Sequence, residues 1–228
     1  MILAAGRGER MRPLSDRVPK PLLPVAGKPL IARLIDQLAR CGIADIVVNV
    51  SHLGELIENA LGNGAAFGVR IAYSREREAL ETAGGIAAAL PLLGDAPFIA
   101  VNSDVYSDFD FTRLDPAAHR LSHTGELAHL VLVDNPLHHP DGDFCLEAGV
   151  VASHGSACFT FSGIGVYQPA LFSSVARGAK AQLAALLREP IAQRRVSGEH
   201  HGGLWIDVGT PERLAQLERL LAHSNADL

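Results

Sequence analysis

The segment LAAGRGERMRP, residues 3–13, decides the fold of this chain. Its first residues continue the apolar start of the sequence, and glycines follow at positions 6 and 8. A glycine loop directly after a buried strand can surround phosphate oxygens with successive backbone N–H groups. The segment therefore predicts a first strand that ends at Ala5 and an anion-binding loop after it. A plain structural turn is the alternative, because a lone GxG pattern does not separate the two.

Basic side chains accompany this loop. Arg7, Arg10 and Arg12 lie within it, and Lys20 follows between two prolines. The prolines restrict the backbone, so the ammonium group can be aimed at a phosphate as a point charge. An exposed lysine on an extended segment is the alternative. Met11 stands where a dinucleotide fingerprint has its third glycine, and no GxxxxGK[ST] exists, so neither a dinucleotide-binding loop nor a P-loop is expected.

Strand-like and helix-like runs alternate through the first half of the chain. Expected strands cover 46–50, 69–73 and 98–101, and expected helices cover 29–40, 51–62 (capped by Ser51) and 84–93. This alternation predicts an α/β fold with a mainly parallel, mixed sheet flanked by helices. Further strands at 127–133, 144–146 and 158–166 suggest a smaller lid. We expect a single domain: a core at about 1–110, the lid at about 111–200, and a returning strand and C-terminal helix at 203–228.

Composition and charge exclude several classes of function. The net charge is -5 with no dense run of Lys or Arg, so the chain offers no basic surface for nucleic acid. No apolar run approaches the roughly 20 residues that cross a bilayer, so no membrane partner is expected. The three cysteines, Cys41, Cys145 and Cys158, form no CxxC pair and are odd in number. Reduced thiols in the cytoplasm are therefore expected, without a disulfide framework or a zinc site.

Two aspartates follow apolar strands. Asp104 comes after 98–101, and Asp207 ends the run 204–207. Open α/β sheets bind ligands at the carboxyl ends of their strands. Two carboxylates and a triphosphate would suit Mg²⁺, which takes one or two protein carboxylates and keeps several waters. Each aspartate alone could equally be a cap or turn residue.

The segment LETAGG, residues 80–85, opens a helix with two glycines. Small residues at this point let a flat base or a ribose approach the backbone closely. An ordinary helix start capped by Thr82 is the alternative.

Taken together, these segments resemble the sugar-1-phosphate nucleotidyltransferase family, whose signature is LAAGxGxRMxP followed by PKPLxPVxGKP. The two parts stand here at residues 3–13 and 19–29, nearly unbroken. The similarity covers the whole chain. Segments 80–85, 102–105, 160–164, 196–200 and 205–210 are most similar to the branch that transfers a uridylyl group from UTP to N-acetylmuramate 1-phosphate in peptidoglycan recycling.

The resemblance implies a Rossmann-like nucleotide-diphospho-sugar transferase fold with a smaller sugar-binding subdomain. It also implies roles for particular side chains. The implied set comprises catalytic Arg10 and Lys20; nucleotide-binding Leu3, Ala4, Ala5, Gly6, Arg7, Gly8, Lys20 and Gly85; sugar-binding Glu81, Asn102, Gly163 and Glu199; and magnesium ligands Asp104 and Asp207.

The implied reaction is attack of a sugar phosphate oxygen on the α-phosphorus of UTP, with release of pyrophosphate. No strong general base is needed, because a phosphate monoester with a second pKa of about 6 is already largely ionised. Many relatives have glycine where Glu81 and Ser103 stand, so Glu81 is a candidate selector of sugar or base.

Three alternatives stay open from the sequence. The same reaction could use mannose 1-phosphate with GTP or glucose 1-phosphate with dTTP. A non-catalytic sugar-nucleotide sensor is the alternative from another class, and an NAD-dependent dehydrogenase is disfavoured by Met11. The resemblance implies a cytoplasmic enzyme, and its oligomeric state stays open, with a monomer allowed.

Overall fold

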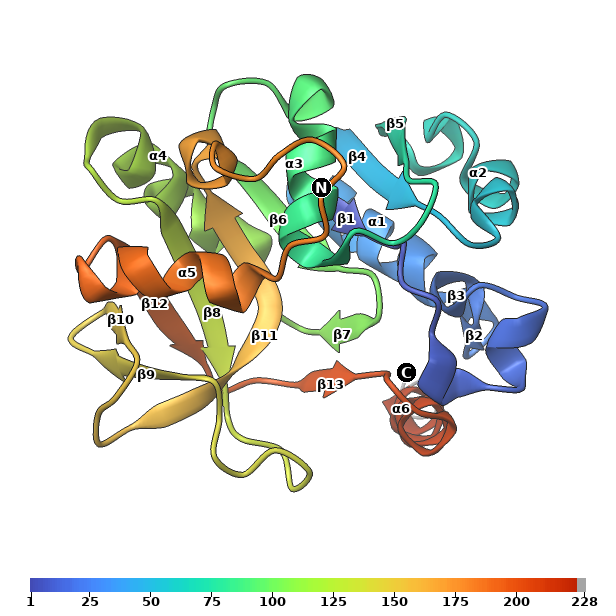
Figure 1. Ribbon diagram of the computed structural model, residues 1–228. Helices are drawn as coiled ribbons and strands as arrows, with labels where there is room; N and C mark the ends of the chain where they lie inside the picture. Colours follow the sequence, from blue (N-terminus) through green and yellow to red (C-terminus); the bar gives the residue numbers. More distant parts are fainter. Residues whose placement is uncertain (225–228) are drawn as a thin grey trace. The chain divides into compact units, whose positions relative to one another are not determined.

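The computed structural model describes residues 1–224, which form two compact units (Figure 1). The N-terminal unit comprises residues 2–79, 102–107 and the stretch from 206, and the central unit comprises Met1, 80–101 and 108–205. Residues 80–101, expected in the core at about 1–110, thus belong to the central unit. The expected division into a nucleotide-binding core and a sugar-binding part stays a prediction. The last four residues of the chain, 225–228, belong to the expected C-terminal part at 203–228 and lie outside the described residues.

The N-terminal unit is built on a parallel sheet. Its strands β1 (Ile2–Leu3), β4 (Asp45–Val50) and β5 (Arg70–Arg75) lie in the order β5-β4-β1. Because all three run in the same direction, their carboxyl ends meet at one edge. The unit also contains α1 (Leu30–Arg40), α2 (Gly54–Leu61), α6 (Pro211–Ser224) and the hairpin β2 (Pro24–Val25) and β3 (Lys28–Pro29). The strand β7 (Val105–Ser107) pairs with β13 (Trp205–Asp207).

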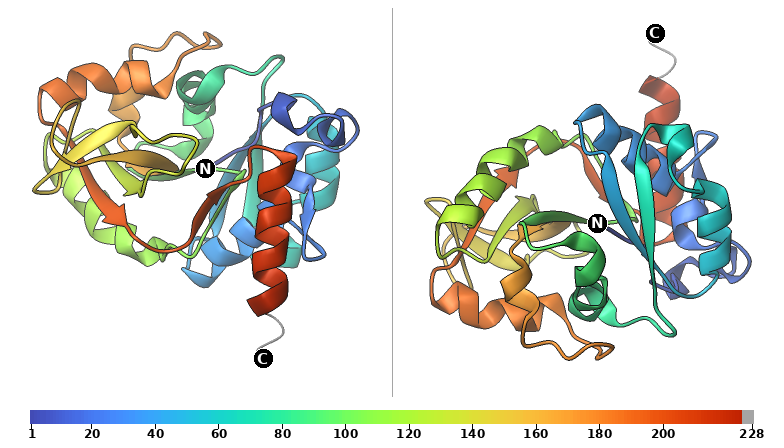
Figure 2. Two further views of the ribbon diagram at one scale, coloured as in Figure 1. Left: turned by 90° about the horizontal axis from the view of Figure 1, so that it is seen from below. Right: turned by 90° about the horizontal axis from the view of Figure 1, so that it is seen from above.

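Helix α6, red in Figure 2, is held by an apolar core of the N-terminal unit. Leu217 is fully buried, and Leu214 and Leu221 pack against the same cluster. Their spacing of three and four residues places them on one face of the helix, which is why this face packs inward. Full burial of one such leucine is worth about 1.5–3 kcal/mol. The packing fixes the chain that leads from β13 into α6.

The central unit contains a mixed sheet in the order β6-β11-β8-β12-β10-β9. Its neighbouring strands are antiparallel, except that β8 and β12 are parallel. Helices α4 and α5 lie on opposite faces of these strands (Figure 2). The bounds are β6 (Phe98–Asn102), β8 (Ala128–Val133), β9 (Phe144–Glu147), β10 (Val150–Ala152), β11 (Cys158–Tyr167), β12 (Val196–His201), α3 (Glu81–Leu93), α4 (Asp115–His123) and α5 (Leu183–Ala192).

The expected α/β fold, a mixed sheet flanked by helices, is confirmed, but several element boundaries differ from the prediction. Strand β1 ends at Leu3 and not at Ala5, because the Ala4 N–H donates to the Asn49 side chain and the chain leaves the sheet there. Helix α2 begins at Gly54 after Leu53, so Ser51 is not its cap. Helix α3 begins at Glu81, three residues earlier than expected.

The structure adds elements that were not predicted. Helices α4 and α5 and strands β7, β10 and β12 were all missed. The Asp115-Pro116 pair was a usable signal for α4, since proline is favoured in the first turn of a helix. Strand β12 has the polar sequence VSGEHH, which carries no strand-like alternation. Within the described residues, no helix combines the length and apolar content needed to span a membrane.

The expectation of three reduced thiols is wrong for one pair. Cys145 on β9 and Cys158 on β11 are directly opposite in the register and form a disulfide, with Cα atoms 3.8 Å apart. Cys41 is free. The odd cysteine count argued against a framework of several bridges, but it could not exclude a single bridge that strand register creates.

Candidate functional site

The loop after β1 packs against Lys20. Gly8 has a φ of 63°, and a Cβ at this position would lie 3.1 Å from the Lys20 Cβ. Both the left-handed conformation and the close approach therefore require glycine. The Met11 N–H donates to the Gly8 carbonyl at 2.9 Å, and the Met11 side chain is fully buried. Met11 thus anchors the loop in the core, which explains a bulky residue where a dinucleotide fingerprint has glycine.

Gly6 differs from Gly8 in its surroundings. A Cβ at Gly6 would meet no protein atom within 4 Å. Glycine at this position is therefore not required by packing within the chain.

Lys20 forms an ion pair with Asp104. Lys20 opens the short helical turn Lys20–Leu22 after Pro19, and its Nζ donates to Asp104 Oδ2. The two side chains are 9% and 29% exposed, so solvent screens this pair much less than a surface pair. The proline-flanked ammonium is thus directed at the aspartate that follows β6.

Asp207 lies in the same part of the N-terminal unit. The Val208 N–H donates to the Asp104 carbonyl at 2.8 Å, so the two aspartates lie on neighbouring segments. Asp207 Oδ2 is 3.0 Å from Arg213 Nη1. A Cβ at Gly209 would lie 3.0 Å from both Arg10 Nη2 and Asp207 Oδ1, which places the Arg10 guanidinium beside this pair.

The N-terminal unit therefore brings together four residues that the sequence singled out: Arg10, Lys20, Asp104 and Asp207. Arg213 completes the cluster and was missed. Its only sequence signal was its place in the first turn of the helix after Asp207. Cationic groups of this kind bind phosphates, and carboxylates bind hard cations.

The chemistry of the two carboxylates fits a magnesium ion bound together with phosphate. Among residues 1–224, no group of three or more His, Cys, Asp or Glu side chains is arranged to hold a metal. Magnesium does not need such a cage, because substrate phosphates and water complete its six ligands. Asp104 and Asp207 each carry two carboxylate oxygens and remain partly accessible, at 29% and 24% exposure.

Glycine 84 in the central unit has a packing role. A Cβ there would lie 2.3 Å from the Ala179 carbonyl oxygen, and the Gly84 N–H donates to the Ala181 carbonyl at 3.2 Å. The segment 179–181 of the same unit thus packs against the start of α3.

The start of α3 differs from the expected cap. Thr82 does not cap the helix, since the N-cap residue is Leu80. Glu81 has a φ of 61°, a conformation that favours glycine.

Gly163 lies in a β-bulge of the central unit. The register of β11 against β8 shifts between Phe161 and Ile164, and Gly163 has a φ of 80°. The Ser162 hydroxyl donates to the Val131 carbonyl at 2.7 Å and accepts from the Ile164 N–H at 3.1 Å. The bulge therefore requires glycine at 163 and fixes its backbone.

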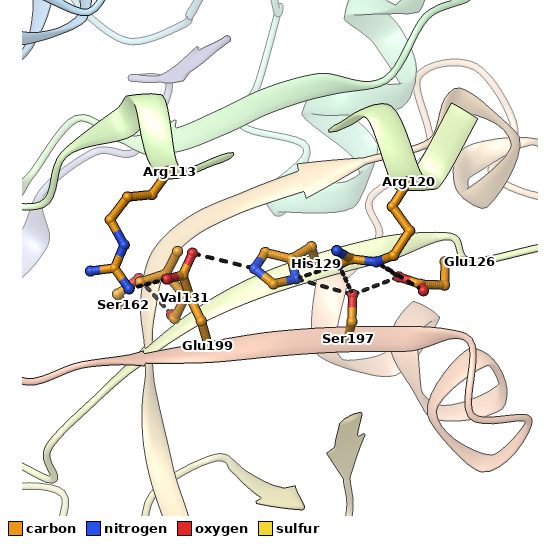
Figure 3. Close-up of polar contacts among 8 residues, drawn as sticks. All are labelled: Arg113, Arg120, Glu126, His129, Val131, Ser162, Ser197 and Glu199. Carbon is orange, nitrogen blue, oxygen red and sulfur yellow. Dashed lines mark hydrogen bonds and ion pairs between the residues drawn. The ribbon is translucent and has the colours of Figure 1, made fainter. Parts of the chain in front are cut away.

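Glu199 takes part in a polar network beneath α4 (Figure 3). One carboxylate oxygen lies 3.4 Å from His129 Nε2, and the other accepts from Arg113. Partial burial acts to raise the pKa of Glu199, but the hydrogen bond with His129 and the charge of Arg113 outweigh it and lower this pKa below its usual value. Its expected role toward a sugar stays a prediction.

The same network continues along β8 and β12. The Ser197 hydroxyl donates to Glu126 at 2.6 Å and accepts from Arg120 at 2.9 Å, and His129 Nδ1 lies 3.0 Å from this hydroxyl (Figure 3). Sequence reasoning missed these contacts, because they depend on the register that places His129 opposite Ser197.

Comparison with known proteins identifies the class of protein that carries this fold and site. Residues 1–140 match the nucleotidyl transferase family, and the chain belongs to that family. The expected enzyme class, nucleotidyltransferase, is therefore confirmed.

Two relatives match almost the whole chain. An N-acetylmuramate alpha-1-phosphate uridylyltransferase of Neisseria meningitidis serogroup B is 54% identical over 96% of this chain and 96% of its own length. A protein of the same name from Caulobacter vibrioides is 34% identical over 98% of this chain and 97% of its own length.

A solved structure shares the fold. A Bacillus anthracis protein described as a glucose-1-phosphate thymidylyltransferase superposes with a TM-score of 0.82, covering 96% of this chain and 93% of the other, at 21% identity. The expected nucleotide-diphospho-sugar transferase fold is confirmed by this likeness.

Proposed function

We propose that the protein transfers a uridylyl group from UTP to N-acetylmuramate 1-phosphate, giving UDP-N-acetylmuramate and pyrophosphate in peptidoglycan recycling. The observation that carries the proposal is the clustering of Arg10, Lys20, Asp104 and Asp207 in one unit. The two N-acetylmuramate alpha-1-phosphate uridylyltransferases that match almost the whole chain support the choice of nucleotide and sugar. A cytoplasmic location follows, because UTP is a cytoplasmic substrate.

In this reaction an oxygen of the sugar phosphate forms a new bond to the α-phosphorus of UTP, and the bond from that phosphorus to the β-phosphate oxygen breaks. Pyrophosphate leaves with the electron pair. No proton must move, because the attacking phosphate is already largely ionised at neutral pH. The protein must therefore reduce repulsion between two anions and stabilise the charge that develops.

Arg10 and Lys20 would supply fixed positive charge to the phosphates. Lys20 is nearly buried and held by Asp104, so its ammonium needs little reorganisation during the reaction. Asp104 and Asp207 would hold Mg²⁺, which supplies Lewis-acid stabilisation of the phosphate oxygens. The backbone of residues 3–8 would bind the nucleotide. Glu81, Asn102, Gly163 and Glu199 are proposed sugar contacts, and Gly85 a contact of the base.

The test is pyrophosphate release from a matrix of the four nucleoside triphosphates and several sugar 1-phosphates. We expect Mg²⁺-dependent release with UTP and N-acetylmuramate 1-phosphate, and loss of release after chelation. N-acetylglucosamine 1-phosphate is the matched control, because it lacks only the lactyl ether. Efficient use of mannose 1-phosphate with GTP would overturn the specificity, and UTP binding without any turnover would favour a sensor.

A further inference from the structure

The loop that follows β1 is attached to a buried polar pair that the catalytic scheme does not use. The Ala4 N–H donates to Asn49 Oδ1 at 2.7 Å, and Asn49 Nδ2 donates to Glu76 Oε1 at 2.7 Å. Ala4, Asn49 and Glu76 are 4%, 3% and 8% exposed. A hydrogen bond in such a place is costly to lose, because water cannot replace the missing partner.

The topology of the sheet explains this connection. Strand β4 lies between β1 and β5, and all three are parallel (Figure 1). Asn49 stands near the carboxyl end of the middle strand, Ala4 directly follows β1, and Glu76 directly follows β5. One side chain on the middle strand therefore ties the exits of both neighbouring strands together.

The backbone at the start of the loop is thereby fixed on both sides. The Leu3 carbonyl accepts from the Ser103 N–H at 3.0 Å, and the next N–H, that of Ala4, goes to the Asn49 side chain. If the parallel strand continued, this N–H would donate to a backbone carbonyl of the neighbouring strand. The Asn49 side chain supplies the acceptor instead, at the point where the chain leaves the sheet.

Resting on the proposed function, we infer that Asn49, oriented by Glu76, is a positioning residue for the nucleotide-binding loop at residues 3–8. It touches no substrate in this scheme. The Asn49 amide accepts with its oxygen and donates with its nitrogen, and the Glu76 carboxylate only accepts. The direction of the two hydrogen bonds is thus set by the chemistry of the pair, and the loop conformation depends on that direction.

This directionality permits a sharp test with purified full-length protein. Asn49→Ala removes the acceptor for the Ala4 N–H. Asn49→Asp keeps an acceptor but places two carboxylates in contact in a buried site, where like charges repel. Adding Glu76→Gln to Asn49→Asp rebuilds the pair with donor and acceptor exchanged. Asn63→Asp is the matched control, because Asn63 Oδ1 also accepts a backbone N–H in this unit, from Ala65 in an exposed turn.

The first measurement is the Kd for UTP with Mg²⁺ by calorimetry. A misplaced loop of this kind can cost on the order of 10²-fold. We expect Asn49→Ala and Asn49→Asp to bind UTP about tenfold to a hundredfold more weakly, the double variant to recover to within about threefold of the parent, and Asn63→Asp to match the parent. The KM for the sugar 1-phosphate should change little, because the effect is confined to the nucleotide. A smaller folded fraction would instead lower the binding stoichiometry and the apparent kcat and leave the Kd for UTP unchanged.

The second measurement is hydrogen exchange of the Ala4 amide in the free protein. It should be slow in the parent and in the double variant, and fast in Asn49→Ala. Failure of the parent to bind UTP would defeat the proposed function but leave this readout intact. A folded Asn49→Ala protein that binds UTP like the parent would overturn the positioning role. If Asn49→Ala fails to fold, a double variant that binds UTP no better than Asn49→Asp would overturn it.

Discussion

Replacing Asp104 by asparagine tests whether the Asp104 carboxylate acts in catalysis or only stabilises the fold. The substitution preserves shape and leaves one oxygen that can accept from Lys20, but it removes the negative charge. Lys20 is only 9% exposed in its side chain, so its ammonium would lose its partner charge in a poorly hydrated place. Two consequences follow, one on stability and one on turnover.

The stability effect is moderate. A hydrogen bond to a charged group is worth about 1.5–3 kcal/mol, and the amide oxygen of asparagine retains part of it. We expect a loss of about 1–2 kcal/mol in the free energy of unfolding. For a chain of this length that corresponds to a fall in Tm of roughly 2–8 °C. The protein should therefore remain folded at 25 °C.

The effect on turnover is much larger. Loss of one group that stabilises developing charge typically lowers the rate on the order of 10²–10³. We expect Asp104→Asn to lower kcat by this factor in the pyrophosphate-release assay with UTP, N-acetylmuramate 1-phosphate and saturating Mg²⁺. Circular dichroism at the assay temperature would establish that the variant is folded.

Asp45→Asn is the matched control. Asp45 pairs with Arg70 at 2.6 Å at the start of β4, and both side chains are about three-quarters exposed. This change of one aspartate charge lies at the amino end of the strand, away from the Lys20 cluster, and should leave kcat unchanged. A folded Asp104→Asn protein with kcat within a few-fold of the parent would refute the assignment of Asp104 as a metal ligand.

Three other substitutions give separate tests. Gly6→Ala adds a methyl group that meets no protein atom, so Tm should hold while UTP binding weakens; unchanged binding would remove residue 6 from the nucleotide site. Gly84→Ala forces a Cβ to within 2.3 Å of the Ala179 carbonyl oxygen, and overpacking of this kind should cost about 1–3 kcal/mol; a thermal melt with no shift would contradict the packing. Partial burial raises the pKa of Glu199, but the hydrogen bond with His129 and a neighbouring guanidinium lower it more. The folded-state pKa thus lies below the unfolded value of 4.5, and the stability that this carboxylate contributes is present above pH 4.5 and is lost as the pH falls further. The difference in Tm between the parent and Glu199→Gln should therefore shrink below pH 4.5, and a constant difference would count against that ionisation.

The sequence by itself determined the family and most of the strands and helices of the N-terminal unit. The motif at residues 3–13 fixes a strand, a glycine loop and basic side chains in a short span, and local chemistry dictates each of them. The order of strands and helices in the first half followed from hydrophobic pattern, with errors of a few residues at element ends. Strand β12 was missed because its polar residues carry no such pattern.

Only the tertiary structure decided which distant side chains touch. Lys20 meets Asp104 across 84 positions, and Ala4 meets Asn49 across 45. Such contacts depend on strand order and register, which bring the ends of several strands to one edge of the sheet. No local sequence pattern predicts them. The disulfide between Cys145 and Cys158 has the same origin, because the pairing of β9 with β11 places the two residues opposite one another.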